Sequence, residues 1–155
     1  MTSNANGCAD VLVRVNPSTF EKRLNITGEI WLQLGDFSFP TQSWTDFPVI
    51  ILSWWLDALD TLHSANSATE FLFMDGPYSF TVSRRNGEYI LHCIEDPRGD
   101  KECLWRGVVD LNGLTSQVRS AAMSVVQQCR RRGWGTRDTS ALESKVAALN
   151  GPQSA

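Results

Sequence analysis

The chain has 155 residues, of which 42% are hydrophobic and 20% are charged, and its formal net charge is −3. This composition is typical of a globular protein and excludes disordered and collagen-like chains. The amino-terminal segment contains no basic region followed by an apolar run, so we expect a cytoplasmic protein without a secretory signal. We expect one domain spanning 1–155, with flexible ends at 1–9 and 150–155.

The first β-strand is predicted at residues 11–16, where valine occupies every second position, and Pro17 is expected to end it. Residues 20–26 fit either a turn or a strand. Apolar side chains then alternate through 29–39, which predicts a strand with a break or bulge at Gly35-Asp36.

The strongest helical signal lies at residues 44–63, WTDFPVIILSWWLDALDTLH. Thr45 or Asp46 is expected to cap its start. Two adjacent apolar stripes, which include Trp54 and Trp55, surround most of the helix and leave only a narrow polar strip. We therefore predict a core helix held on several sides by the rest of the domain, too short in its apolar part to span a membrane.

A β-hairpin is predicted around Asn86-Gly87, because both residues accept the positive φ of a type I′ turn. Pairing across this turn puts Val82 opposite Leu91 and Phe80 opposite Cys93, so apolar residues face apolar residues. The hairpin is therefore expected to present one face to the core.

Two further strands are predicted beside the hairpin, at 71–74 and at 103–111, the second with a possible bulge at Gly107. After them the apolar period becomes helical, with Thr115 as the expected N-cap and Gly133 as the residue that ends the helix. A last helix is expected at 140–149. The predicted fold class is α+β: a mostly antiparallel sheet packed on a central Trp-rich helix, with one or two carboxy-terminal helices.

The cysteines carry no recognisable chemical motif, because their spacing fits neither a zinc site nor a disulfide framework. We interpret Cys93 and Cys103 as small core hydrophobes. A nucleophile–base pair of His92 with Cys93 is disfavoured, since adjacent strand residues point to opposite faces. Phosphate-binding glycine loops are also missing from the sequence, so we predict no enzyme activity, no cofactor and no bound metal.

Two motifs that contain arginine are interpreted as structural. The tripeptide at 98–100 matches an integrin-recognition motif by composition only, and we expect a turn there. The arginines at 130–132 are expected to complement the dipole at a helix end, rather than to bind nucleic acid.

The acidic residues are distributed unevenly along the chain. Residues 1–112 contain 15 acidic and 8 basic side chains, giving −7, and the interval between Arg23 and Arg84 holds seven carboxylates but no lysine or arginine. One interpretation is an ordinary solvated surface. The other is a negative field that steers a basic partner. The candidate partner-binding residues are Asp57, Asp60, Asp75, Glu95, Asp96, Asp100 and Glu102.

Three segments, WTDF at 44–47, the tryptophan-rich stretch at 54–56 and FLFMDGPY at 71–78, give the chain a resemblance to small bacterial cytoplasmic immunity proteins. These belong to contact-dependent inhibition and related polymorphic toxin systems. The resemblance implies a protein that binds one cognate toxin domain and blocks its active site. Many such toxins are basic nucleases, so an acidic inhibitor surface is the expected complement, and neither nucleic acid nor membrane is an expected partner.

Two alternatives remain open at this stage. The first is a small enzyme or ligand-binding domain with a pocket between the sheet and the central helix, lined by Trp54, Trp55, Tyr78 and His92. The second is a structural subunit of a larger assembly. The sequence leaves the oligomeric state open.

Overall fold

The computed structural model describes residues 8–64 and 68–149. Within these ranges the chain forms two sheets and three helices, which is the α+β class predicted. The larger sheet has the order β1 (Cys8–Ala9), β9 (Glu102–Val109), β8 (Glu88–Glu95), β7 (Tyr78–Arg85), β6 (Thr69–Leu72). The smaller sheet contains β2 (Val11–Lys22), β3 (Ile26–Leu34), β4 (Phe37–Phe39) and β5 (Thr45–Asp46). The helices are α1 (Pro48–Ser64), α2 (Leu111–Arg131) and α3 (Arg137–Leu149). The expected flexible segments 1–7 and 150–155 lie outside the described residues.

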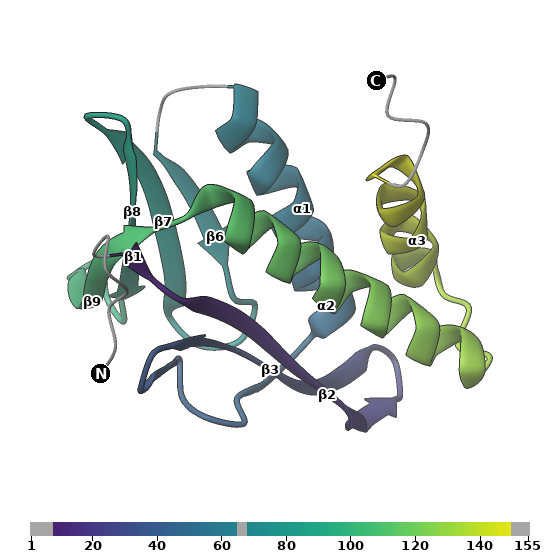
Figure 1. The fold of residues 1–155 in the computed structure, drawn as a ribbon. Coiled ribbons are helices and arrows are strands. Elements are labelled where there is room, and N and C mark those ends of the chain that lie inside the picture. The colour runs from purple at the N-terminus through teal and green to yellow at the C-terminus, as the bar shows by residue number, and fades with distance from the viewer. Residues whose placement is uncertain (1–7, 65–67, 150–155) are drawn as a thin grey trace.

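Helices α1 and α2 pack against the sheets, and α3 packs against α1 and α2. Figure 1 shows α1 and α2 side by side, with the larger sheet to the left and the smaller sheet below them. Helix α1 contacts β3, β6, α2 and α3, so the prediction of a core helix held on several sides is confirmed. The buried apolar residues form one cluster that draws on all three helices and both sheets.

Helix α1 starts later than the sequence suggested. It begins at Pro48, whose missing N–H has no partner to lose in the first turn of a helix. The two residues expected to cap it, Thr45 and Asp46, instead form β5 and pair with β3. The first helical hydrogen bond runs from the Ile51 N–H to the Phe47 carbonyl oxygen, so Phe47 occupies the capping position.

The two neighbouring tryptophans of α1 have different environments. Trp55 is fully buried, whereas Trp54 is 38% exposed and lies on the solvent strip with Asp57 and Thr61. A helix turns about 100° per residue, so adjacent side chains cannot both face the same neighbour. The expectation that both tryptophans belong to the core was wrong for Trp54.

The amino-terminal strand continues beyond its predicted end, and a separate short strand precedes it. Cys8 and Ala9, expected to be loosely attached, pair in parallel with Val108 and Val109 of β9. Pro17 does not end β2, which continues to Lys22 beyond an irregularity in its pairing with β3. A bulge can accommodate proline because the local ladder bond is already interrupted.

The predicted hairpin is confirmed. Val82 lies opposite Leu91 and Phe80 opposite Cys93. The turn residues Asn86 and Gly87 have φ values of 53° and 80°. In the neighbouring pair, however, the irregularity lies between Cys93 and Ile94 on β8 and not at Gly107. Gly107 has another role. A Cβ there would lie 2.6 Å from the Trp105 ring, so glycine allows that ring to pack against the backbone at this position.

The thiols show one wrong prediction. Cys93 is buried, as expected, but Cys103 is exposed and its Sγ lies 3.3 Å from the Trp105 carbonyl oxygen. Burial raises the pKa of the Cys93 thiol and, to a smaller extent, that of Cys129. We expect Cys103 to react rapidly with a thiol-reactive disulfide reagent, and Cys93 and Cys129 to react only after unfolding. Peptide mass mapping of the labelled native chain checks this, and labelling of Cys93 before Cys103 would contradict it.

The carboxy-terminal helices begin earlier than predicted. Asp110, not Thr115, caps α2 by accepting the Gly113 N–H at 3.0 Å. Helix α3 starts at Arg137 rather than Ser140, because Thr136 and Thr139 each accept the other's backbone N–H in a reciprocal cap. The end of α2 is as predicted, with Gly133 at a φ of +67°.

Candidate acidic binding surface

The seven predicted carboxylates fall into two groups. Asp57 and Asp60 lie on α1, about 14 and about 18 Å along the helix from Pro48 at 1.5 Å per residue. The other five lie where the β6–β7 turn and the β8–β9 connection meet, at one end of the larger sheet: Asp75, Glu95, Asp96, Asp100 and Glu102. We call residues 73–77 and 95–102 the acidic end.

Strand pairing brings the segments of the acidic end together. Glu95 is paired with Tyr78 on one side and with Glu102 on the other. The Asp96 N–H donates to the Pro77 carbonyl oxygen at 2.8 Å, which joins the two loops directly. The acidic end is therefore attached to the strand ends of a sheet, a position that holds binding groups in place.

The charges of the acidic end are not neutralised locally. It contains five carboxylates and two cations, Arg98 and Lys101. In the part of the chain that the structure describes, none of these five carboxylates takes part in an ion pair. The Asp96 Oδ1 atom is also buried without a hydrogen-bond partner there. The excess of carboxylates therefore gives this end of the sheet a negative electrostatic potential.

Tyr78 and Glu95 make one internal contact at this end. Burial, together with the charge of Glu95 and a hydrogen bond to its carboxylate, raises the pKa of the Tyr78 phenol. Tyr78 packs edge-on against Phe39 and Trp44, with ring centroids 5.7 and 5.3 Å away. The phenol thus holds Glu95 beside the core, while Asp75, Asp100 and Glu102 are exposed.

Asp46 orients the β6–β7 turn, a role that sequence analysis missed. Its carboxylate is buried and accepts the Asp75 N–H at 3.1 Å, the Phe47 N–H at 2.8 Å and the Trp44 Nε1–H at 2.9 Å. These bonds connect the start of α1 and the smaller sheet to the acidic end. Gly76 has a φ of +74° and lies against the Trp44 ring, so the turn fits closely at this point.

Three exposed apolar side chains accompany the carboxylates. Leu72, Met74 and Leu104 are 44%, 44% and 37% exposed. The register places Leu72 in the same row across the sheet as Cys103, which directly precedes Leu104. Apolar anchors surrounded by charged groups are typical of protein–protein interfaces. The predicted strands at 71–74 and 103–111 include these residues, but their sequence pattern does not indicate that the side chains are exposed.

Asp57 and Asp60 do not belong to this surface. Asp57 pairs with Lys145 of α3, with Nζ and Oδ2 2.8 Å apart. Asp60 is exposed on the same helix. Helix α1 therefore places these two carboxylates apart from the other five.

The side chains of the alternative pocket lie apart from one another. Trp55 is in the core and Trp54 faces solvent. His92 lies opposite Thr81 and Arg106 on the sheet face away from the buried Cys93. The pKa of His92 is lowered mainly by partial burial, and further by the positive charges of Arg106 and Arg85.

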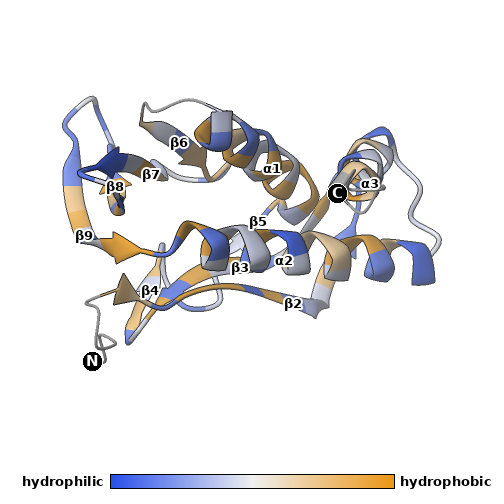
Figure 2. Ribbon diagram, turned by 45° about the horizontal axis from the view of Figure 1, so that its top comes forward, coloured by the Kyte–Doolittle hydropathy of each residue, from blue (hydrophilic) through white to orange (hydrophobic). Residues whose placement is uncertain are grey.

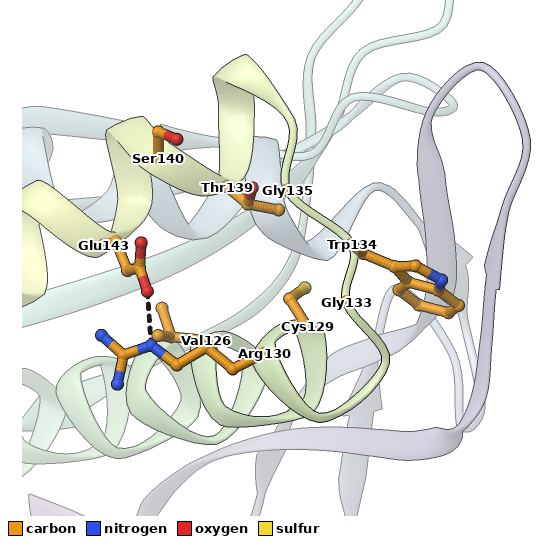
Figure 3. Close-up of a pocket in the computed structure, with 9 residues that line it drawn as sticks. All are labelled: Val126, Cys129, Arg130, Gly133, Trp134, Gly135, Thr139, Ser140 and Glu143. Carbon is orange, nitrogen blue, oxygen red and sulfur yellow. Dashed lines mark hydrogen bonds and ion pairs between the residues drawn. The ribbon is translucent and has the colours of Figure 1, made fainter.

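A small hollow lies instead between α2 and α3 (Figure 3). Its volume is about 100 Å³, and its lining includes Cys129 and the ion pair of Arg130 with Glu143. Ligand pockets usually measure about 300 to 1,000 Å³. This hollow is therefore smaller than most ligand pockets.

Among the described residues, no three histidine, cysteine or acidic side chains lie close enough to hold a metal ion together. None of the described helices has the length and apolar character needed to cross a membrane. Comparison of the chain with protein-family models, curated proteins and solved structures finds no match.

Proposed function

We propose that this chain is a cytoplasmic immunity protein that binds a basic, nuclease-like toxin domain through the acidic end and covers the toxin's active site. The observation that carries the proposal is that the acidic end holds five carboxylates, none in an ion pair within the described residues, together with the exposed Leu72, Met74 and Leu104. The resemblance to immunity proteins supplies the class of partner. The free thiols of Cys93, Cys103 and Cys129 suit the reducing cytosol.

The two kinds of side chain have different effects on binding. Unpaired surface carboxylates accelerate the encounter with a basic partner and orient it. Exposed apolar side chains slow dissociation when they fill pockets on the partner. The acidic end provides both, and its backbone is fixed by strand pairing, so little ordering is required when the partner binds.

Charge reversal tests the proposal. We expect Asp75→Lys combined with Glu102→Lys to lower the association rate with a basic nuclease-type toxin domain by about tenfold or more at low ionic strength, with a smaller change in dissociation. The test first screens a panel of such domains by pull-down, then measures rate constants for the domain that binds. Added salt should reduce the difference between variant and wild type, because exposed charges are screened.

Asp60→Lys combined with Glu70→Lys is the matched control, because it makes the same change in net charge at exposed positions outside the acidic end. We expect it to slow association much less. Equal slowing by the two variants would show that net charge rather than the acidic end controls binding. Absence of binding to every domain in the panel at low salt would contradict the proposal itself.

A further inference from the structure

Strand β2 has one edge that none of the other described strands covers. It pairs with β3 on one side, while the Val13 N–H points the other way and donates to Oε1 of Gln117 on α2 at 3.0 Å. Backbone groups alternate in direction along an antiparallel strand. The N–H and C=O groups of Val11 and Val15 therefore line the same free edge as those of Val13.

Helix α2 runs beside this edge and leaves a groove. Figures 1 and 2 both show β2 and α2 side by side, and the two elements are in contact. Two hollows of about 520 and about 400 Å³ follow the line between them. The helix side of these hollows carries mainly small side chains, Gly113, Ser116, Ser120, Ala121 and Ser124, together with Leu114, Gln117 and the cap residue Asp110. We call the space between residues 11–16 and 113–124 the β2–α2 groove.

The dimensions of the groove suit a short strand. Residues 11–16 extend about 17 Å at 3.3 Å per residue, and residues 113–124 extend about 17 Å at 1.5 Å per residue. Within the described part of the chain, the Gln117 amide makes the one hydrogen bond recorded to the free edge of residues 11–15. An edge with open donors and acceptors is a template for pairing with another chain.

The outer face beside the edge adds a charge preference. Arg14 is exposed and has no ion pair among the described residues, and Leu12 on the same face is 36% exposed. An added strand would place one side chain opposite each of them. A carboxylate opposite Arg14 and an apolar residue opposite Leu12 are the complementary choices.

We infer that the β2–α2 groove binds an extended peptide segment of a protein partner, which adds to β2 as an antiparallel strand and takes the place of the Gln117 amide. Its acidic residue lies opposite Arg14 and its apolar residue opposite Leu12. Side chains on the other face of the added strand point toward the small residues of α2. This surface is separate from the acidic end and does not depend on the proposed function.

The test uses the whole chain and the fluorescent peptide acetyl-Thr-Val-Glu-Val-Leu-Val-Thr-amide, followed by fluorescence anisotropy. We expect saturable binding. N-methylation of the three valines removes the peptide N–H groups that face β2, and should weaken binding by about tenfold or more. N-methylation of the glutamate and leucine, whose N–H groups face away, is the matched control and should change binding much less.

Three variants of the chain locate the peptide. Val13→Pro removes the outward N–H at an edge position that tolerates proline, and should abolish binding while the circular dichroism spectrum is retained. Gln117→Ala removes the competing amide and should strengthen binding several-fold. Arg14→Glu should weaken binding of this peptide and restore it when the peptide glutamate is replaced by lysine.

Several results would overturn the inference. These are the absence of saturable binding, equal loss from N-methylation at either set of positions, and unchanged binding to a folded Val13→Pro chain. If Val13→Pro fails to fold, the response to Gln117→Ala and the charge exchange at Arg14 decide the question. Weaker binding to a folded Gln117→Ala chain would also reject the proposed displacement.

Discussion

Replacing Asp46 with alanine is expected to lower the free energy of unfolding by about 3 to 5 kcal/mol, because three donors lose their buried acceptor at about 1 to 3 kcal/mol each. These donors are the N–H groups of Phe47 and Asp75 and the indole Nε1–H of Trp44. Urea unfolding, followed by tryptophan fluorescence, gives the value. A loss below about 1 kcal/mol would show that water replaces the carboxylate and that the network is not essential.

Thr45→Ala is the matched control, because Thr45 is the exposed neighbour in the same strand. It should change stability by no more than about 0.5 kcal/mol. Asp46→Asn is informative in addition, since an amide keeps one acceptor oxygen but brings an NH₂ group toward donors. We expect a loss of stability between those of the alanine variant and the control. Association of a partner at the acidic end should also be slower, because the Asp75 N–H no longer donates to a carboxylate.

Trp55→Ala is expected to lower the free energy of unfolding by about 3 to 5 kcal/mol, while Trp54→Ala lowers it by about 1 kcal/mol or less. The Trp55 ring packs edge-on against Phe73 and Phe80 with centroids 5.3 and 5.1 Å away, and its Nε1–H donates to the Leu72 carbonyl oxygen at 2.8 Å. Truncation leaves both a cavity and an unpaired carbonyl. Chemical denaturation of the two single variants, which are neighbours in sequence, measures the contrast.

Trp55→Phe separates the two contributions. It keeps a ring in the core and removes the donor to Leu72, so we expect a loss between those of the two alanine variants. Equal stability of Trp54→Ala and Trp55→Ala would contradict the assignment of Trp55 to the core and Trp54 to the solvent face.

Features set by local chemistry were predicted well. The Asn86-Gly87 turn and the register of Val82 with Leu91 follow from two adjacent residues that accept positive φ and from a period of two. The end of α2 at Gly133 has the same local origin. In each case the residues that decide the structure are close neighbours along the chain.

Features that depend on distant partners were missed. The pairing of Cys8 with Val108 joins residues about 100 positions apart, and no local pattern encodes it. Asp46 has the sequence of a helix cap, but the Asp75 N–H, 29 residues away, makes it a junction between the sheet and the acidic end. Its buried position could not be inferred without knowing that β5 pairs with β3.

The arrangement of the carboxylates depends on both local and distant contacts. Their excess is visible in the sequence, and the hairpin with its neighbouring strands places five of the seven at one sheet end. The pairing of Asp57 with Lys145, 88 residues away on α3, could not be predicted from the sequence. The exposed Leu72, Met74 and Leu104 escaped notice since apolar strand residues are normally assigned to a core face.

Amide NMR mapping of the chain with its bound basic domain tests most directly whether the acidic end contacts the partner. We predict chemical-shift changes and line broadening concentrated at residues 73–77 and 95–102, with the amides around Asp57 and Asp60 unchanged. Changes concentrated on α1 and α3, with the acidic end unaffected, would contradict the claim.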